Sequence, residues 1–183
     1  MCTLFAVTLG AISALIVILL VSITWPQHRI WPPKEGSRLT FSFVWLLTIF
    51  VFGDLLILGI LDWNQLGWPG NIHLFAGGAL IAVGNVLAWV GVHQLGVLTT
   101  SGGQGEIITG GLYRYSRNPQ YCGDILILIG WAIMSASASV FIATPLAISA
   151  LVLTPFAEEP WLKGRFGEEY TTYARQTPRF LYL

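Results

Sequence analysis

Charge is the scarcest feature of this chain of 183 residues. It has nine lysines and arginines and nine aspartates and glutamates, so charged residues make up 10% of the sequence and the formal net charge is zero. Soluble domains contain roughly 25% charged residues, whereas this chain is 55% hydrophobic and has a mean hydropathy of +0.70. The composition excludes a disordered chain, a nucleic-acid binder that uses a basic surface, and a typical cytosolic enzyme.

Cysteine, metal-ligand motifs and nucleotide motifs are scarce as well. Cys2 and Cys122 are too few for a disulfide framework or a cysteine-rich zinc site. The histidines, His28, His73 and His93, do not have the spacing of a metal site. The chain contains no Walker A motif and no G-x-G-x-x-G after a strand. We therefore predict no metal site and no nucleotide-phosphate site of these kinds.

Four long apolar tracts indicate an integral membrane protein. They cover about residues 3–23, 39–61, 72–95 and 121–156. A bilayer crossing takes about 20 residues of helix at 1.5 Å per residue, so the last tract predicts two helices joined by a turn near Ser135–Ser139. Because lipid offers backbone N–H and C=O groups no partner, the spans must be helical. The sequence therefore predicts an all-α fold of five transmembrane helices in a single membrane domain, residues 1–183.

The basic residues predict the orientation of these spans. All nine lie between spans one and two, between spans three and four, or after span five: Arg29, Lys34, Arg38, Arg114, Arg117, Lys163, Arg165, Arg175 and Arg179. Five alternating spans place all of them on one side, and the loop Asp62–Asn71 on the other side has none. The positive-inside rule then predicts an outside N-terminus and a cytoplasmic C-terminus. We expect a multi-pass protein of a bacterial or archaeal inner membrane or of the endoplasmic reticulum membrane.

Two polar segments on the predicted cytoplasmic side are the candidate functional regions. The first, Gly96–Tyr121, is rich in glycine, which is typical of a flexible loop but also lets backbone approach a ligand closely. The second, Glu158–Leu183, begins with Glu158 and Glu159 where the last span leaves the membrane. An interfacial amphipathic helix that starts at Pro160 explains most of its charges. It explains the adjacent carboxylates less well, because carboxylates at a membrane edge are costly unless they have partners.

These segments resemble the isoprenylcysteine carboxyl methyltransferase family, part of a wider group that includes phospholipid N-methyltransferases and small-thiol methyltransferases. The resemblance rests on residues 111–123, GLYRYSRNPQYCG. It is joined to the pattern EE-x-x-L-x-x-x-FG-x-x-Y-x-x-Y-x-x-x-x-PRF of residues 158–180, with the predicted helical hairpin between the two. It covers about the C-terminal half of the chain. Residues 1–95 match only as three generic membrane spans, and residues 96–183 would form the cofactor loop, the hairpin and a covering C-terminal segment.

The resemblance implies S-adenosylmethionine (SAM) as the cofactor and a lipophilic acceptor that enters from the bilayer, with no nucleic-acid partner. The SAM-binding residues implied by motif position are Gly105, Glu106, Ile107, Ile108, Tyr113, Asn118, Pro119, Gln120, Tyr121 and Glu158. Three further residues are candidates for the catalytic machinery. Arg117 would pair with the SAM carboxylate, Glu159 would accept a proton from an amine or thiol acceptor, and Arg179 would tie the C-terminal segment over the cavity.

Two departures from the family pattern bear on the acceptor. Family members usually have His where this chain has Asn118, and Asn forms hydrogen bonds but does not titrate near neutral pH. We therefore expect position 118 to bind SAM and not to move protons. Eukaryotic members have an Arg, thought to meet the substrate, where this chain has Thr154, which disfavours isoprenylcysteine. A lipid amine, a thiol and a prenylcysteine-like carboxylate all stay open as acceptors.

Two other functions stay open from the sequence alone. One is an NADPH-dependent reductase, because the membrane sterol reductases have a related C-terminal half, although they are usually much longer. The other is a non-enzymatic membrane scaffold that keeps the helices without the chemistry.

Polar and small residues inside the predicted spans give further expectations. Asp54 and Asp124 are candidates for function because acids within a bilayer are costly. Asp124 is expected either to face the cofactor site or to cap its helix. Asp54 is expected either to have a functional role or to form a hydrogen bond between helices, for which Asn85 is one candidate partner. Gly77, Gly78 and Gly84 favour close packing of the third span against a neighbouring helix.

Overall fold

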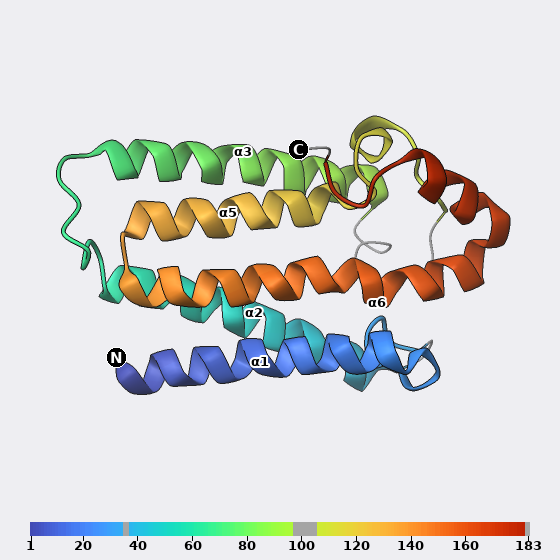
Figure 1. Ribbon diagram of the computed structural model, residues 1–183, viewed down its shortest axis with the longest axis horizontal. Helices are drawn as coiled ribbons and strands as arrows, with labels where there is room; N and C mark the ends of the chain where they lie inside the picture. The colour runs from blue at the N-terminus through green and yellow to red at the C-terminus, as the bar shows by residue number, and fades with distance from the viewer. Residues whose placement is uncertain (35–36, 97–105, 182–183) are drawn as a thin grey trace.

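The computed structural model describes residues 1–34, 37–96 and 106–181, and these residues form helices and connecting segments without a strand. The elements in chain order are α1 (Cys2–Thr24), η1 (Pro26–His28), α2 (Arg38–Leu61), α3 (Ile72–Leu95), η2 (Gly111–Arg114), α5 (Pro119–Ser135) and α6 (Ala138–Gln176). The long helices run side by side as a bundle (Figure 1). The all-α prediction is therefore confirmed.

Apolar length makes this bundle a multi-pass membrane protein. Four helices, α1, α2, α3 and α6, are long and apolar enough to cross a membrane. Large apolar side chains cover their outer faces, and Leu39 and Phe75 are 87% and 78% exposed. Such surfaces suit lipid and not water. The fifth predicted crossing, α5, has 17 residues, which is slightly less than the about 20 residues of a full crossing, so a count of five stays a prediction.

Glycines hold α3 against α5. A Cβ added at Gly84 would lie 2.6 Å from the carbonyl oxygen of Gly123, and one added at Gly130 would lie 2.7 Å from that of Gly77. Only the absence of side chains allows backbones to approach this closely, and such packing stabilises helix pairs where lipid removes most of the hydrophobic driving force. The predicted packing role is confirmed for Gly77 and Gly84, and it fixes the first turn of α5 beside the end of α3. The prediction is wrong for Gly78, where an added Cβ would meet nothing within 4 Å.

The turn between α5 and α6 lies where small polar residues predicted it. Ala136 adopts a left-handed conformation that ends α5, and the Ser137 side chain accepts a hydrogen bond from the Val140 N–H to cap α6. Ser139 Oγ donates to Asp62 Oδ2 over 2.5 Å, which ties this turn to the end of α2.

The predicted start of a separate helix at Pro160 is wrong. α6 continues through Pro155 and Pro160 and departs from helical geometry only at Gly167, where φ is 57° and ψ is −126°. The φ of proline fits a helix, so an internal proline removes one hydrogen bond and bends the helix without necessarily stopping it. A glycine is needed for the backbone conformation at position 167. The kink turns the last part of α6 back over the ends of α3 and α5 (Figure 1).

Both polar segments lie at the same end of the bundle. η1, η2 and the final part of α6 gather there, whereas the N-terminus, the α2–α3 loop and the α5–α6 turn lie at the opposite end (Figure 1). The fold thus brings residues 106–121 and 158–181 together, as the sequence predicts.

Candidate functional site

A cavity of about 130 Å³ lies between the two polar segments. Eight of the ten predicted cofactor-binding residues line it: Glu106, Ile107, Ile108, Tyr113, Asn118, Gln120, Tyr121 and Glu158. Pro119 is buried in the first turn of α5 and is not part of the lining. Gly105 lies outside the described residues. Among the predicted catalytic residues, Arg117 lines the cavity and Glu159 and Arg179 do not.

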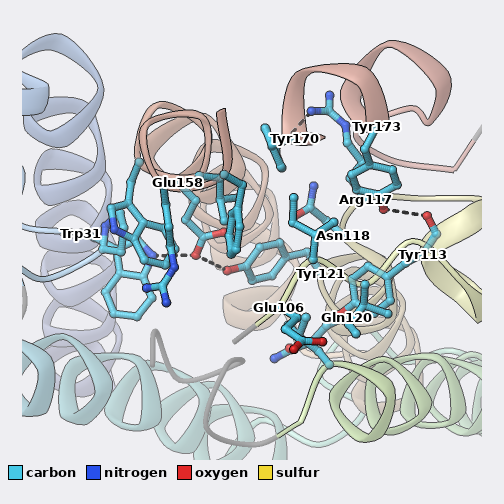
Figure 2. Close-up of a pocket in the computed structure, with 18 residues that line it drawn as sticks. Trp31, Glu106, Tyr113, Arg117, Asn118, Gln120, Tyr121, Glu158, Tyr170 and Tyr173 are labelled. Carbon is cyan, nitrogen blue, oxygen red and sulfur yellow. Dashed lines mark hydrogen bonds between the residues drawn. The ribbon is translucent and has the colours of Figure 1, made fainter. Parts of the chain in front are cut away.

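Glu158 presents a carboxylate that has hydrogen bonds but no cation. Its Oε1 atom accepts from Trp31 Nε1 and from the Tyr121 hydroxyl, each over 2.8 Å (Figure 2). Both ion pairs found in the described part of the chain involve Glu159 and neither involves Glu158. A carboxylate away from water is costly without a positive partner. The site therefore offers a place for a positively charged group.

Glu159 has the opposite environment, because two arginines neutralise it. Arg179 donates from Nε and Nη2 to the two carboxylate oxygens over 2.7 and 2.8 Å, and Arg117 Nη1 lies 2.9 Å from Oε1. The Glu159 side chain is 12% exposed. The hydrogen bonds to Glu159 raise the pKa of Arg179 above its usual value, so this guanidinium keeps its charge. Paired in this way, and outside the cavity lining, Glu159 is positioned to orient Arg117.

Backbone hydrogen bonds fasten the C-terminal segment to the start of α5. The Arg117 N–H donates to the Pro178 carbonyl over 2.9 Å. The Arg179 carbonyl accepts from Ser116 Oγ over 3.2 Å and from Asn118 Nδ2 over 3.0 Å. Ser116 is fully buried. The tie predicted for Arg179 is thus present in the geometry, and the Asn118 amide takes part in it while lining the cavity.

Three tyrosines from η2 and the C-terminal part of α6 form one wall of the cavity. Tyr113, Tyr170 and Tyr173 pack together and are buried. Tyr173 donates to the Tyr113 carbonyl over 2.6 Å, and Arg117 Nη1 donates to the Tyr170 hydroxyl over 3.4 Å (Figure 2). Burial raises the pKa of Tyr113 well above its ordinary value, so its phenol stays neutral. The wall is therefore aromatic and uncharged, which suits a cation or a planar ring.

Sequence reasoning missed several residues of this lining. Tyr170 and Tyr173 are three residues apart, a spacing that places both on one face of a helix. The sequence therefore contained a pattern that could have predicted this aromatic face. Trp31 had no such signal, because it is 127 residues from Glu158 in the sequence.

One buried donor of the site has no partner. Arg117 Nε is inaccessible to water and forms no hydrogen bond with the described residues. A buried donor left in this state costs free energy until a ligand accepts from it. The cavity thus combines an unused guanidinium donor, which suits an anionic group, with the Glu158 carboxylate, which suits a cationic one.

A second cavity of about 810 Å³ adjoins the first and extends into the bundle. Its lining comes mainly from α1, α2, α5 and α6, and it shares Trp31, Gln120 and Tyr121 with the first cavity. Asp124 and Thr154 also line it. Cavities of about 300–1,000 Å³ with largely apolar linings are typical of small-molecule sites.

Asp54 belongs to neither cavity. It is buried and accepts a hydrogen bond from Thr8 Oγ1 over 3.3 Å. The predicted bond to Asn85 is wrong, since Asn85 Nδ2 donates to the Ile81 carbonyl over 2.9 Å on its own helix. Asp54 therefore links α1 to α2, and the expected hydrogen bond between helices is present with Thr8 as the partner.

The sequence is similar to a protein-family model and to a known protein. The family model described as phospholipid methyltransferase matches residues 72–169, which is more than half of the chain and runs from α3 into α6. A steroid 5-alpha-reductase, DET2 of Solanum lycopersicum, is 29% identical over 124 residues, which cover 66% of this chain and 45% of that protein. The match thus spans less than half the length of this relative. No solved structure matches the chain significantly.

Proposed function

The chain belongs to the phospholipid methyltransferase family, and from this premise we propose that it transfers a methyl group from SAM to a lipophilic acceptor. The observation that carries the proposal is Glu158, a carboxylate of the smaller cavity that has no cation among the described residues. It accepts hydrogen bonds from Trp31 and Tyr121, which line both this cavity and the larger, mainly apolar one. A carboxylate suits the binding of a sulfonium, and an apolar approach suits a lipid.

The residues of the smaller cavity fit the charges of SAM. Its sulfonium suits the Glu158 carboxylate and the faces of Tyr113 and Tyr121, since a cation–aromatic contact contributes about 0.5–2 kcal/mol. Its carboxylate suits the unpaired Nε of Arg117. SAM supplies, when bound, a methyl group on a positively charged sulfur. The cavity of about 130 Å³ is smaller than typical ligand pockets, so SAM binding requires that the cavity widens.

The contribution of the chain to the reaction would be positioning. Tyr121 and Trp31 line both cavities, so the acceptor and the methyl group would meet beside them. Holding reacting atoms about 3–3.5 Å apart in a dry site accounts for much of the catalysis expected of such an enzyme. A thiolate or carboxylate acceptor needs no base, whereas an amine or a thiol must first lose a proton. Glu159, held by two arginines, would act by orienting Arg117.

The proposal includes an orientation in the membrane. α5 would be the fifth crossing, with the N-terminus outside and the C-terminus in the cytoplasm. Support comes from the loops that carry the basic residues, which gather at one end of the bundle (Figure 1). The smaller cavity lies at that end, so it would face the compartment in which SAM is made.

A second candidate function is an NADPH-dependent reduction. The similarity to a steroid 5-alpha-reductase favours it. The two functions differ in the cofactor that the smaller cavity accepts, and they share an apolar substrate.

Calorimetric titration of the detergent-purified chain with SAM, with S-adenosylhomocysteine and with NADPH separates the candidates. We expect the first two to bind and NADPH not to bind. Binding of NADPH alone would favour the reductase, and binding of none would favour a scaffold. Glu158→Gln should weaken SAM binding, and exchange of Glu168, which is exposed on the same helix, for Gln is the matched control for the loss of one carboxylate.

A further inference from the structure

The larger cavity has one charged side chain in its lining. Apolar residues supply most of this lining, and the described residues that form it include no Lys, Arg or His. Asp124 is the exception. Thr154, at the position where related eukaryotic enzymes have an Arg, also lines this cavity and donates its hydroxyl to the Ala150 carbonyl over 2.9 Å. The electrostatic character of the cavity is therefore set by one carboxylate.

Asp124 has no partner of its own. No hydrogen bond or ion pair within the described residues involves it. It follows Tyr121 by three residues on α5, so the two side chains share a helix face and both line the larger cavity. Because an acid within a membrane bundle is costly without a partner, a positively charged guest would stabilise it.

A second polar group of the same cavity is unpartnered. Trp45 contributes to the lining, and its Nε1 atom is buried without a hydrogen-bond partner. An indole N–H only donates, so it suits an oxygen of the guest. The cavity thus offers the Asp124 carboxylate and the Trp45 N–H donor among apolar side chains.

We propose that the larger cavity binds a lipid amine and that Asp124 holds its ammonium group beside Tyr121. This inference rests on the proposed methyl transfer, whose acceptor it identifies by class. An ammonium has no free electron pair, so the Asp124 carboxylate would first accept one proton from it. The freed nitrogen would then form a bond to the methyl carbon as the bond between that carbon and the sulfur breaks, and S-adenosylhomocysteine would be the neutral leaving group. A carboxylate acceptor would find no cation here and would be repelled by Asp124. A phospholipid headgroup would bring a phosphate with no positive partner in the cavity. The acceptor is therefore an amine on a long-chain or polycyclic body that carries no anionic group.

Tryptophans of the cavity supply the readout for a test. Trp45 and Trp131 line it, and bromine quenches tryptophan fluorescence on contact. The probes are 11-bromoundecylamine and 11-bromoundecanoic acid, which differ only in the sign of the head charge. The full chain is reconstituted in phosphatidylcholine nanodiscs and titrated with each probe. We expect the amine to give saturable quenching with a Kd at least about tenfold below that of the acid, as a charge-assisted hydrogen bond implies.

Variants make the assignment specific. Asp124→Asn is expected to bring the two Kd values within about twofold of one another, because the side chain keeps its shape and loses its charge. Gly53 lines the cavity, and a Cβ there meets nothing within 4 Å, so Gly53→Leu should fill the volume and weaken amine binding at least about tenfold. Gly10 also has open space around a Cβ but does not line the cavity, so Gly10→Leu should bind the amine as the wild type does.

Several results would overturn the inference. These are equal or tighter binding of the acid by the wild type, an unchanged preference in Asp124→Asn, or an unchanged amine Kd in Gly53→Leu. SAM titration of the same wild-type samples separates this inference from the proposed function. Amine preference without SAM binding would contradict the methyltransferase proposal alone, and SAM binding without amine preference would overturn the lipid-amine inference alone.

Discussion

Exchange of Glu158 for Gln should weaken cofactor binding without lowering the stability of the ligand-free protein. In the wild type, Trp31 Nε1 and the Tyr121 hydroxyl both donate to one oxygen of Glu158. The carbonyl oxygen of Gln can accept both of these hydrogen bonds. The variant therefore keeps the local packing and loses only the negative charge. We expect weaker SAM binding together with an unchanged or higher unfolding temperature of the ligand-free protein.

The size of the affinity loss follows from electrostatics. A sulfonium about 4 Å from the carboxylate would be attracted by about 4 kcal/mol at an effective dielectric constant of about 20. Loss of carboxylate hydration on binding offsets part of this attraction, and a net loss of half, about 2 kcal/mol, corresponds to about 30-fold in Kd. Without SAM, Glu158 has no cation within the described part of the chain, so removing its charge lifts a desolvation cost and does not lower stability.

Calorimetry with SAM and thermal unfolding in detergent measure the two quantities. Glu168→Gln, exposed on the same helix, should leave both at wild-type values. Glu158→Ala should lose affinity and stability together, because it also removes the acceptor for Trp31 and Tyr121. A Glu158→Gln variant with wild-type SAM affinity, or with a strongly lowered unfolding temperature, would refute the reasoning.

Three further predictions concern the framework of the site. Arg179→Ala removes two hydrogen bonds to Glu159 and should lower the free energy of unfolding by about 1–3 kcal/mol. The loss is limited because Arg117 still pairs with Glu159. The variant should also weaken SAM binding, and wild-type unfolding and affinity would contradict the role of Arg179 in fastening the C-terminal segment. Gly84→Leu should prevent close packing of α3 on α5 and destabilise the fold by more than about 3 kcal/mol, measured as loss of folded protein in detergent; a folded variant of normal stability would contradict the packing. Gly167→Ala should cost about 1–3 kcal/mol at a backbone conformation that favours glycine, and an unchanged unfolding temperature would count against the kink.

The helices could be predicted because the forces that define them are local. Apolar length alone gave the bounds of α1, α2 and α3, and small polar residues marked the turn at Ala136 and Ser137. The spacing of Gly77 and Gly84 predicted a close helix contact, although their partner α5 became known only from the structure. The error at Pro160 has a physical origin. A proline is tolerated inside a helix when packing outweighs one lost hydrogen bond, and packing is not visible in a local pattern.

The site could be predicted only in part, because its charges are paired by contacts distant in sequence. The motif positions Tyr113, Tyr121 and Glu158 could be assigned from resemblance, and they do line one cavity. Trp31, which bonds to Glu158, reads in the sequence as part of an interfacial aromatic belt. The different environments of Glu158 and Glu159 also could not be read from two adjacent letters. They depend on the path of the C-terminal segment after Gly167, which brings Arg179 to Glu159 alone.

The central claim is methyl transfer from SAM to a lipophilic acceptor, and one labelling experiment tests it most directly. Membranes that contain the wild-type chain, and matched membranes that contain Glu158→Gln, are incubated with SAM labelled in its methyl group, and the organic extract is analysed by mass spectrometry. The account predicts a labelled, organic-soluble product in the wild-type membranes and a strongly reduced amount with Glu158→Gln. An extract without label, from membranes in which the chain reduces a lipid at the expense of NADPH, would contradict it.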